Sequence, residues 1–239
     1  MPLNTVLPRY RPLLWLLGVF LLASLATRMA LLAATPAALS APVLDVVLAF
    51  VTGACYDLLA FVYFSWPLVL LLWLMPRRWS KAQSARWAVA ALCFVLLLVL
   101  LFVAVAEWTF SEEFQARFNF IAVDYLVYTT EVLGNIRESF PVGWILSGIA
   151  AAGVAIFVAT RKLRPMGHVD AGFWRRAAVP FVWALATVAG TAAISTDLKD
   201  HSTNTYVNEL AGNRIYQFFA AYRNASLLAF NPPYDGGWT

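Results

Sequence analysis

The sequence predicts an all-α integral membrane protein with five transmembrane helices and additional interfacial amphipathic helices. Of the 239 residues, 62% are hydrophobic and only 13% are charged, and the mean hydropathy is +0.71. An ordinary soluble domain is about 45–50% apolar and about 25% charged. Several apolar stretches approach or exceed the roughly 20 residues that a helix needs to cross a bilayer. Basic residues gather in alternate links between these stretches.

The expected spans follow one another along the chain. The first covers residues 13–34, and Arg28 interrupts its outer half. The second lies within residues 43–75, which are too many for one perpendicular span, and Pro67 predicts a kink there. The remaining spans are expected at residues 88–106, 142–160 and 177–194.

Small residues inside the spans lead to two expectations about packing. Gly143, Gly148 and Gly153 of the fourth span have a spacing that permits close approach of a neighbouring helix. Cys55 and Cys93 both lie in apolar spans and lack the spacing of metal ligands. We expect both cysteines to be small buried hydrophobic residues.

The distribution of basic residues predicts the orientation of the chain. They occur before the first span, after the second and after the fourth, whereas the link after the first span has none and the stretch after the third is net acidic. The positive-inside rule places the amino terminus in the cytoplasm. The net charge of +4 is thereby explained by orientation, so that no nucleic-acid partner is expected.

Two regions follow from this topology. Residues 1–195 form the five-span transmembrane domain, which includes an outer-face segment at 107–141, and residues 196–239 form an extracytoplasmic juxtamembrane helix and linker. Aromatic and acidic side chains interleave in the outer-face segment, which predicts one or two amphipathic helices at the membrane face. Residues 208–223 also have helical periodicity and predict an interfacial helix. Its apolar stripe would consist of Leu210, Ile215, Phe218, Phe219 and Tyr222.

Two opposite charges inside the spans are expected to form an ion pair. At 1.5 Å per residue, Arg28 lies about 22 Å from the inner edge of the first span, and Asp57 about 25 Å from the inner end of the second. Unpaired charge is costly at such depths, so we predict that Arg28 and Asp57 pair near the outer leaflet boundary. Two interpretations stay open. The pair fixes the helix register, or it belongs to a polar pocket in which Arg28 meets a lipid phosphate and Asp57 a hydroxyl.

A second candidate headgroup site lies in the outer-face segment. Arg117, Asn119, Asp124 and Glu131 could line it, and the alternative is the solvated face of an interfacial helix. The sequence offers no Ser/His/Asp arrangement, no phosphate-binding glycine loop and no paired metal motif. No catalytic residue, metal ligand or cofactor is therefore expected in this chain.

Several runs of sequence together resemble a known family. They are RMALL at 28–32, GACYDL at 53–58, RFNFIAVDYLVY at 117–128, EVLGNIRES at 131–139, NELAGN at 208–213 and IYQFF at 215–219. The chain resembles the membrane half of bacterial lipoteichoic acid synthase-like phosphoglycerol transferases and related membrane sulfatases.

The resemblance implies five spans followed by a large extracytoplasmic domain of the alkaline phosphatase superfamily. That domain uses a threonine nucleophile and a divalent metal, typically manganese, to move glycerol phosphate from phosphatidylglycerol onto a glycolipid or glycan. This sequence departs from the pattern because it ends where such a domain is expected to begin. Thr239 does not stand in the nucleophile's motif, and neither a catalytic role nor a metal ligand transfers to this chain.

The expected function is that of a module in the bacterial cytoplasmic membrane. It would anchor and present phospholipid headgroups, phosphatidylglycerol among them, to a separate extracytoplasmic sulfatase-type domain. Whether the chain takes part in an enzyme stays open. The alternatives are a small transporter, against which the lack of inverted repeats argues, and a structural membrane scaffold.

Overall fold

The computed structural model describes residues 7–35, 40–80, 82–114, 140–164, 172–193, 202–213 and 215–216. These residues are helical apart from short turns and connections, and none of them forms a strand. The longer helices are α1 (Arg11–Ala34), α3 (Val43–Phe64), α4 (Trp66–Leu74), α6 (Gln83–Phe114), α9 (Val142–Ala159), α11 (Ala178–Ala193) and α12 (Thr205–Ala211). The short ones are η2 (Leu7–Tyr10), α5 (Arg77–Ser80), η3 (Arg161–Leu163) and α10 (Phe173–Arg176).

Four helices in the described part of the chain are long and apolar enough to cross a membrane, and they agree with the first four predicted spans. They are Pro8–Ala34, Val43–Phe64, Gln83–Ala106 and Val142–Ala159. A helix also forms where the fifth span is predicted, but α11 has only 16 residues. At 1.5 Å per residue it extends about 24 Å, less than the roughly 30 Å of a hydrocarbon core. The fifth crossing therefore stays a prediction.

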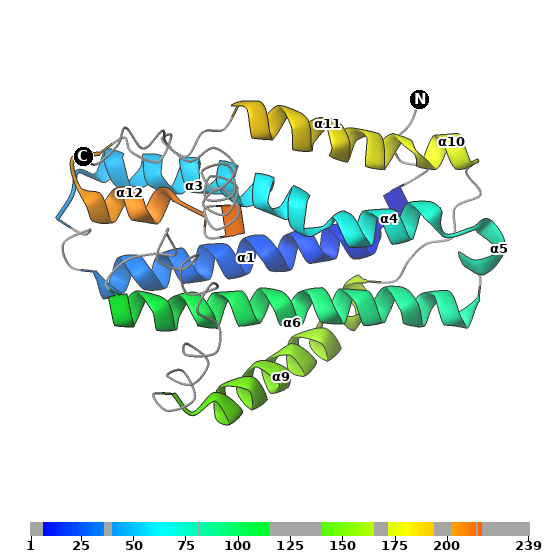
Figure 1. The fold of residues 1–239 in the computed structure, drawn as a ribbon, viewed down its shortest axis with the longest axis horizontal. Coiled ribbons are helices and arrows are strands. Elements are labelled where there is room, and N and C mark those ends of the chain that lie inside the picture. Colours follow the sequence, from blue (N-terminus) through cyan, green and yellow to red (C-terminus); the bar gives the residue numbers. More distant parts are fainter. Residues whose placement is uncertain are drawn as a thin grey trace, which may run out of the picture.

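Helix α1 lies at the centre of the bundle (Figure 1). Helix α3 packs on one side of it and α6 on the other, and α4 also contacts α6. Helix α9 packs against α6, and α11 packs against α3 and α4. The start of α1 lies with α5 and α10 at one end of the bundle, and α12 lies beside α3 at the other. We call these the basic end and the α12 end.

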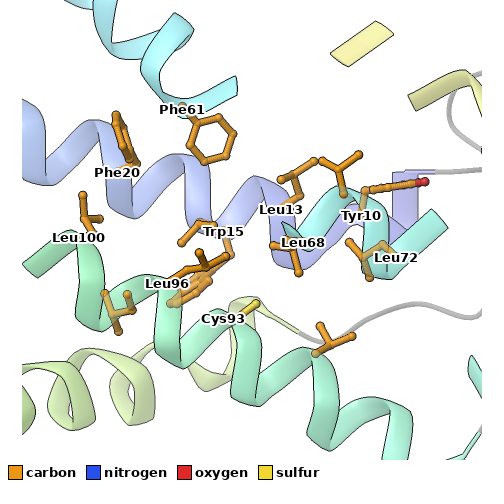
Figure 2. Packing of buried hydrophobic residues seen from close by; sticks show 14 of the residues in the cluster. Tyr10, Leu13, Trp15, Phe20, Phe61, Leu68, Leu72, Cys93, Leu96 and Leu100 are labelled. Carbon is orange, nitrogen blue, oxygen red and sulfur yellow. The ribbon is translucent and has the colours of Figure 1, made fainter. Parts of the chain in front are cut away.

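The core lies between α1, α3, α4 and α6 (Figure 2). Leu16 and Phe20 of α1 are almost fully buried together with Leu68 and Leu72 of α4. Many large apolar side chains point outward instead, including Trp144, which is 83% exposed. Such a surface is unusual on a soluble monomer and is expected where lipid covers the helices.

The second apolar region breaks at the predicted proline. Pro67 cannot donate a backbone hydrogen bond, and the chain makes a turn at Ser65 before α4 begins with this proline in its first turn. Helix α11 packs on the break through hydrogen bonds. Trp183 Nε1 donates to Ser65 Oγ at 2.9 Å, and Trp66 Nε1 donates to Thr187 Oγ1 at 3.1 Å. Such polar contacts join helices inside a bilayer.

The expectations about small residues are only partly correct. A Cβ added at Gly153 would lie 2.6 Å from Leu98 of α6, so this glycine allows close approach of the two helices. Gly143 and Gly148 have nothing within 4 Å of such a Cβ, and the prediction for them was wrong because that face of α9 meets no other described segment. Cys93 is buried as predicted, but Cys55 is exposed, because no described helix covers its side of α3.

Replacing Gly153 with alanine tests the contact between α9 and α6. Alanine is favoured over glycine in a helix by roughly 0.5–1 kcal/mol, so Gly148→Ala should leave the free energy of unfolding unchanged or raised. In Gly153→Ala the new methyl must displace the Leu98 side chain, and we expect a free energy of unfolding about 1 kcal/mol below that of Gly148→Ala. Thermal unfolding of both variants in detergent measures the difference, and equal midpoints would contradict the contact.

The predicted outer-face segment begins inside a helix. Helix α6 continues from the third span to Phe114, beyond the predicted end of that span at residue 106. Residues 115–139 lie outside the described residues, so the amphipathic helices expected there stay predictions.

Candidate functional site

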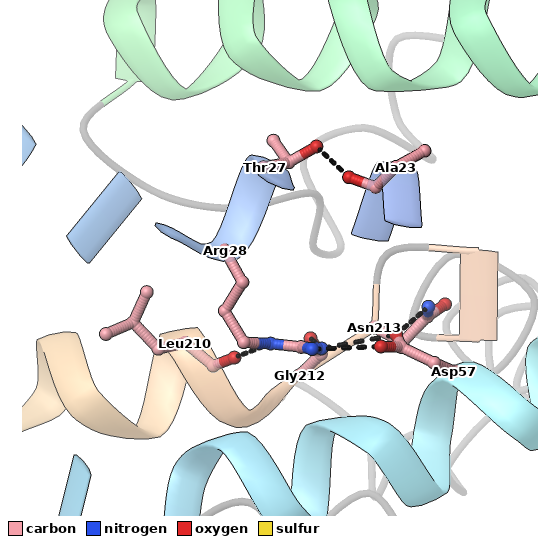
Figure 3. A network of polar contacts seen from close by, with 7 residues as sticks. All are labelled: Ala23, Thr27, Arg28, Asp57, Leu210, Gly212 and Asn213. Carbon is pink, nitrogen blue, oxygen red and sulfur yellow. Dashed lines mark hydrogen bonds and ion pairs between the residues drawn. The ribbon is translucent and has the colours of Figure 1, made fainter. Parts of the chain in front are cut away.

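Arg28 of α1 and Asp57 of α3 form the predicted ion pair (Figure 3). Arg28 Nη1 donates to Asp57 Oδ2 at 2.9 Å, and Nη2 donates to Oδ1 at 3.2 Å, which is the paired geometry that arginine and carboxylate prefer. Arg28 is only 4% exposed and Asp57 only 3% exposed. The ion pair that was predicted from the similar depths of the two residues is therefore confirmed.

The segment that follows α11 completes this site. Arg28 Nε donates to the Leu210 carbonyl at 2.8 Å, and Nη2 also approaches the Gly212 carbonyl at 3.5 Å. Asn213 Nδ2 donates to Asp57 Oδ1 at 2.7 Å. Figure 3 shows the guanidinium group of Arg28 between the end of α12 and Asp57. Three segments far apart in the sequence thus meet at one buried group of polar atoms.

The tail helix differs from the prediction of one helix over residues 208–223. Helix α12 begins earlier, at Thr205, where the Asn204 side chain accepts a hydrogen bond from the Tyr206 backbone. It ends at Ala211, because Gly212 adopts an extended conformation with ψ of 157°. Apolar periodicity alone does not show this break, and residues beyond 216 lie outside the described part.

Asn213 explains why the chain turns at this point. Its amide group donates to Asp57, while its Oδ1 accepts a hydrogen bond from the Tyr216 backbone at 3.0 Å. Asparagine side chains commonly start a new helical turn in this way. The Tyr216 ring packs on Tyr56 of α3 with ring centroids 5.0 Å apart. The break in the tail helix therefore directs polar and aromatic side chains toward α3.

The apolar face of α12 packs against the two spans. Val207, Leu210 and Ala211 are buried with Leu31 of α1 and Ala49 of α3. The spacing of the three α12 residues is that of one helix face. Of the predicted apolar stripe only Leu210 belongs to this face, because Ile215 follows the break after Ala211, and Phe218, Phe219 and Tyr222 lie outside the described residues. At the start of the segment, Ser202 Oγ donates to Asp45 Oδ2 of α3 at 2.6 Å. The juxtamembrane segment, by which we mean residues 202–216, is thus fixed to the bundle along its length.

A glycine makes room for the arginine. A Cβ added at Gly53 would lie 2.5 Å from Arg28 Cζ and Nη2. Gly53 precedes Asp57 by one helical turn, so the two residues share a face of α3. The sequence prediction missed both Gly53 and Asn213. Gly53 could have been predicted from the sequence, because a small residue one helical turn from an intramembrane carboxylate leaves space for a long cationic side chain.

Of the two interpretations of the ion pair, the geometry favours the one in which it fixes the helix register. The donors of Arg28 are directed to one carboxylate and to carbonyls of the juxtamembrane segment. A lipid phosphate would have to replace one of these acceptors, so headgroup binding by Arg28 and Asp57 stays a prediction. The other predicted headgroup residues lie outside the described residues: Arg117, Asn119, Asp124 and Glu131.

Two further arginines are buried at the basic end, where the sequence suggested only an orientation signal. Arg9 is 1% exposed and donates to the Leu72 and Met75 carbonyls, both at 2.6 Å. Arg176 is 5% exposed and donates to the same Met75 carbonyl at 2.6 Å. These carbonyls end α4, where the helix dipole is negative and cations are favoured. The two arginines therefore join the amino end, α4 and α10.

Removing the Asn213 side chain should loosen the juxtamembrane segment without unfolding the bundle. Asn213→Ala loses the hydrogen bond to Asp57 and the cap on Tyr216. We expect the free energy of local opening of this segment to fall by about 1–2 kcal/mol. Hydrogen exchange of the amides in residues 205–216 measures this loss. Thr203→Ala, at an exposed position in the same segment, is the control and should leave exchange unchanged. Equal protection in the wild type and Asn213→Ala would exclude the proposed contribution of Asn213.

Comparison of the chain with protein-family models, with curated proteins and with solved structures gives no match.

Proposed function

We propose that this chain is the membrane module of a lipoteichoic acid synthase-like phosphoglycerol transferase or membrane sulfatase. Its work is to anchor an extracytoplasmic catalytic domain that lies outside this sequence and to present phospholipid headgroups to it. The proposal combines the sequence resemblance with one structural observation. That observation is the attachment of the juxtamembrane segment to α1 and α3 through buried charges and hydrogen bonds.

The attachment suits an anchor because it fixes the direction in which the chain continues. A flexible linker would leave a following domain free to move relative to the bilayer. Here Leu210, Gly212 and Asn213 are held by Arg28 and Asp57, close to where the chain would leave the membrane. A domain that follows would keep a defined position above the bundle, as access to a lipid headgroup requires. The divalent metal that the resemblance implies would belong to that domain.

The proposed location is the bacterial cytoplasmic membrane, with the amino terminus in the cytoplasm and the juxtamembrane segment outside. The support is the gathering of the basic links at one end of the bundle and the positive-inside rule. It requires α10 and α11 to complete a fifth crossing. Backbone hydrogen bonds from Ala177 to Phe173 and from Phe181 to Ala177 connect these two helices, which lengthens the helical stretch available to cross.

A photoreactive phosphatidylglycerol tests headgroup presentation. The purified chain is reconstituted in vesicles with this lipid, or with a phosphatidylcholine that carries the same photoreactive group near its headgroup. Crosslinked peptides are then identified by mass spectrometry. We expect phosphatidylglycerol crosslinks to be enriched in residues 107–141 and 202–216. Identical patterns and yields for the two lipids within these two ranges would contradict a headgroup-presenting module.

A structural scaffold is the second candidate, and the protein acceptors of Arg28 favour it. An ion pair whose hydrogen bonds all go to protein acceptors can hold the three segments in register without any bound lipid. Crosslinks to residues 107–141 and 202–216 separate the two candidates, because a scaffold has no reason to prefer phosphatidylglycerol over phosphatidylcholine at these segments.

A further inference from the structure

The basic end contains a cavity of about 270 Å³ between α1, α6 and the chain that follows α9. Three arginines line it, namely Arg86 at the start of α6 and Arg161 and Arg164 after α9. Pro12, Val89 and Phe157 provide apolar wall. The cavity lies at the opposite end of the bundle from the ion pair of Arg28 and Asp57, so it is a separate site.

Among the described residues, the charged side chains that line this cavity are all positive. No carboxylate from the described part of the chain lines it, and the ion pair found among these residues belongs to the α12 end. Arg86 and Arg161 are exposed, which leaves their donors accessible to a ligand. Like charges around one cavity repel each other, and an anion bound in the cavity would reduce this repulsion.

Arg164 is held in place and still has an unused donor. Its Nη2 donates to the Phe157 carbonyl at 2.6 Å, and its Cζ lies 3.3 Å from the centroid of the Phe157 ring. The Nε atom is buried and meets no acceptor within the described ranges. Burial lowers the pKa of Arg164, since desolvation disfavours the charged group. A hydrogen-bonded anion would compensate for this desolvation.

The position of the cavity indicates the source of the anion. Trp87 also lines it and is 67% exposed, and tryptophan side chains of membrane proteins concentrate at the level of the lipid headgroups. Basic pockets between membrane helices on the cytoplasmic side are suited to anionic headgroups. The volume is slightly below the roughly 300–1,000 Å³ of pockets for drug-sized ligands, so it suits a headgroup rather than a whole lipid.

We propose that this cavity binds the phosphodiester headgroup of an anionic phospholipid from the leaflet at the basic end. The phosphate accepts hydrogen bonds from Arg86, Arg161 and Arg164, and the glycerol region rests against Pro12 and Val89. The acyl chains remain in the bilayer outside the cavity. This inference does not depend on the proposed function, which concerns the opposite end of the bundle.

Native mass spectrometry of the purified chain in a nonionic detergent tests the proposal. Dioleoylphosphatidylglycerol is titrated in, with dioleoylphosphatidylcholine and inorganic phosphate as separate arms. The test variant is Arg86→Gln/Arg161→Gln/Arg164→Gln. The control is Arg11→Gln/Arg78→Gln/Arg175→Gln, which removes the same charge from exposed residues of the basic end outside the cavity.

We expect the wild type to bind phosphatidylglycerol about tenfold or more tightly than phosphatidylcholine, because the arginines form charge-assisted hydrogen bonds with its phosphate and no choline group opposes them. The test variant should lose this preference and the control should keep it. Equal losses in both variants would indicate general electrostatic attraction and overturn the proposal.

Two outcomes keep the proposal falsifiable with the wild type alone if the test variant does not fold. The absence of any preference for phosphatidylglycerol over phosphatidylcholine would overturn it. Displacement of the lipid by an equal concentration of inorganic phosphate would overturn the assignment to a lipid and indicate a site for free phosphate. Phosphatidylglycerol that stays bound in excess phosphate supports the assignment.

Discussion

Replacing Asp57 with leucine should lower the free energy of unfolding by about 3–5 kcal/mol, because Arg28 is then left buried without a carboxylate. Arg28 is 4% exposed and its side chain is directed toward Asp57, so water cannot take the place of the lost partner without a rearrangement. The loss should also reach the juxtamembrane segment, since Asn213 loses its acceptor on α3. Thermal unfolding in detergent measures the first effect, and hydrogen exchange of residues 205–216 measures the second.

The double variant Arg28→Met/Asp57→Leu is the matched control for Asp57→Leu. It removes both charges, and apolar replacements for a buried ion pair are often neutral or stabilising. We expect the unfolding midpoint to return close to that of the wild type. Protection of residues 205–216 should nevertheless stay low, because the Leu210 and Gly212 carbonyls have lost the donor that held them. A single variant as stable as the wild type would show that the charge pair is not buried in the folded protein.

Gly53→Ala should be the second most damaging single change, although it adds only one methyl group. The new Cβ would lie 2.5 Å from Arg28 Cζ and Nη2. A flexible side chain could move aside, but this guanidinium is hydrogen-bonded to Asp57 and to Leu210. We therefore expect the free energy of unfolding to fall by about 2–3 kcal/mol, which is toward the upper end of the range for overpacked cores.

Gly18→Ala provides the comparison for Gly53→Ala, since nothing lies within 4 Å of a Cβ at Gly18. It should keep or slightly raise the unfolding midpoint, because alanine favours a helix. The two variants are compared by thermal unfolding in the same detergent. Comparable midpoints would mean that Arg28 does not occupy the space beside Gly53.

The sequence predicted those features that depend on local composition or on depth along a helix. The first four spans follow from long apolar stretches, and the break near Pro67 follows from a missing backbone donor. The pairing of Arg28 with Asp57 could be predicted because each lies at a calculable height in its span. Antiparallel neighbours of equal height need no further information to meet.

The features that the sequence did not reveal depend on contacts between distant segments. Asn213 belongs to a segment more than 150 residues from Asp57, and periodicity cannot show that its side chain leaves the helix to reach α3. The burial of Arg9 and Arg176 depends on the carbonyls that end α4. Counting basic residues to predict orientation does not reveal such contacts. Spacing also could not distinguish Gly153 from Gly143 and Gly148, because the difference lies in which face of α9 meets α6.

Labelling of single cysteines in cells tests most directly whether the juxtamembrane segment and the basic end lie on opposite sides of a membrane. In a chain lacking Cys55 and Cys93, the substitutions Thr203→Cys and Arg175→Cys place a thiol at one exposed position of each end. A membrane-impermeant maleimide should label Thr203→Cys in intact spheroplasts and should label Arg175→Cys only after the membrane is permeabilised. Labelling of Thr203→Cys only after permeabilisation, or equal labelling of both variants in intact spheroplasts, would contradict a fifth crossing and an extracytoplasmic tail.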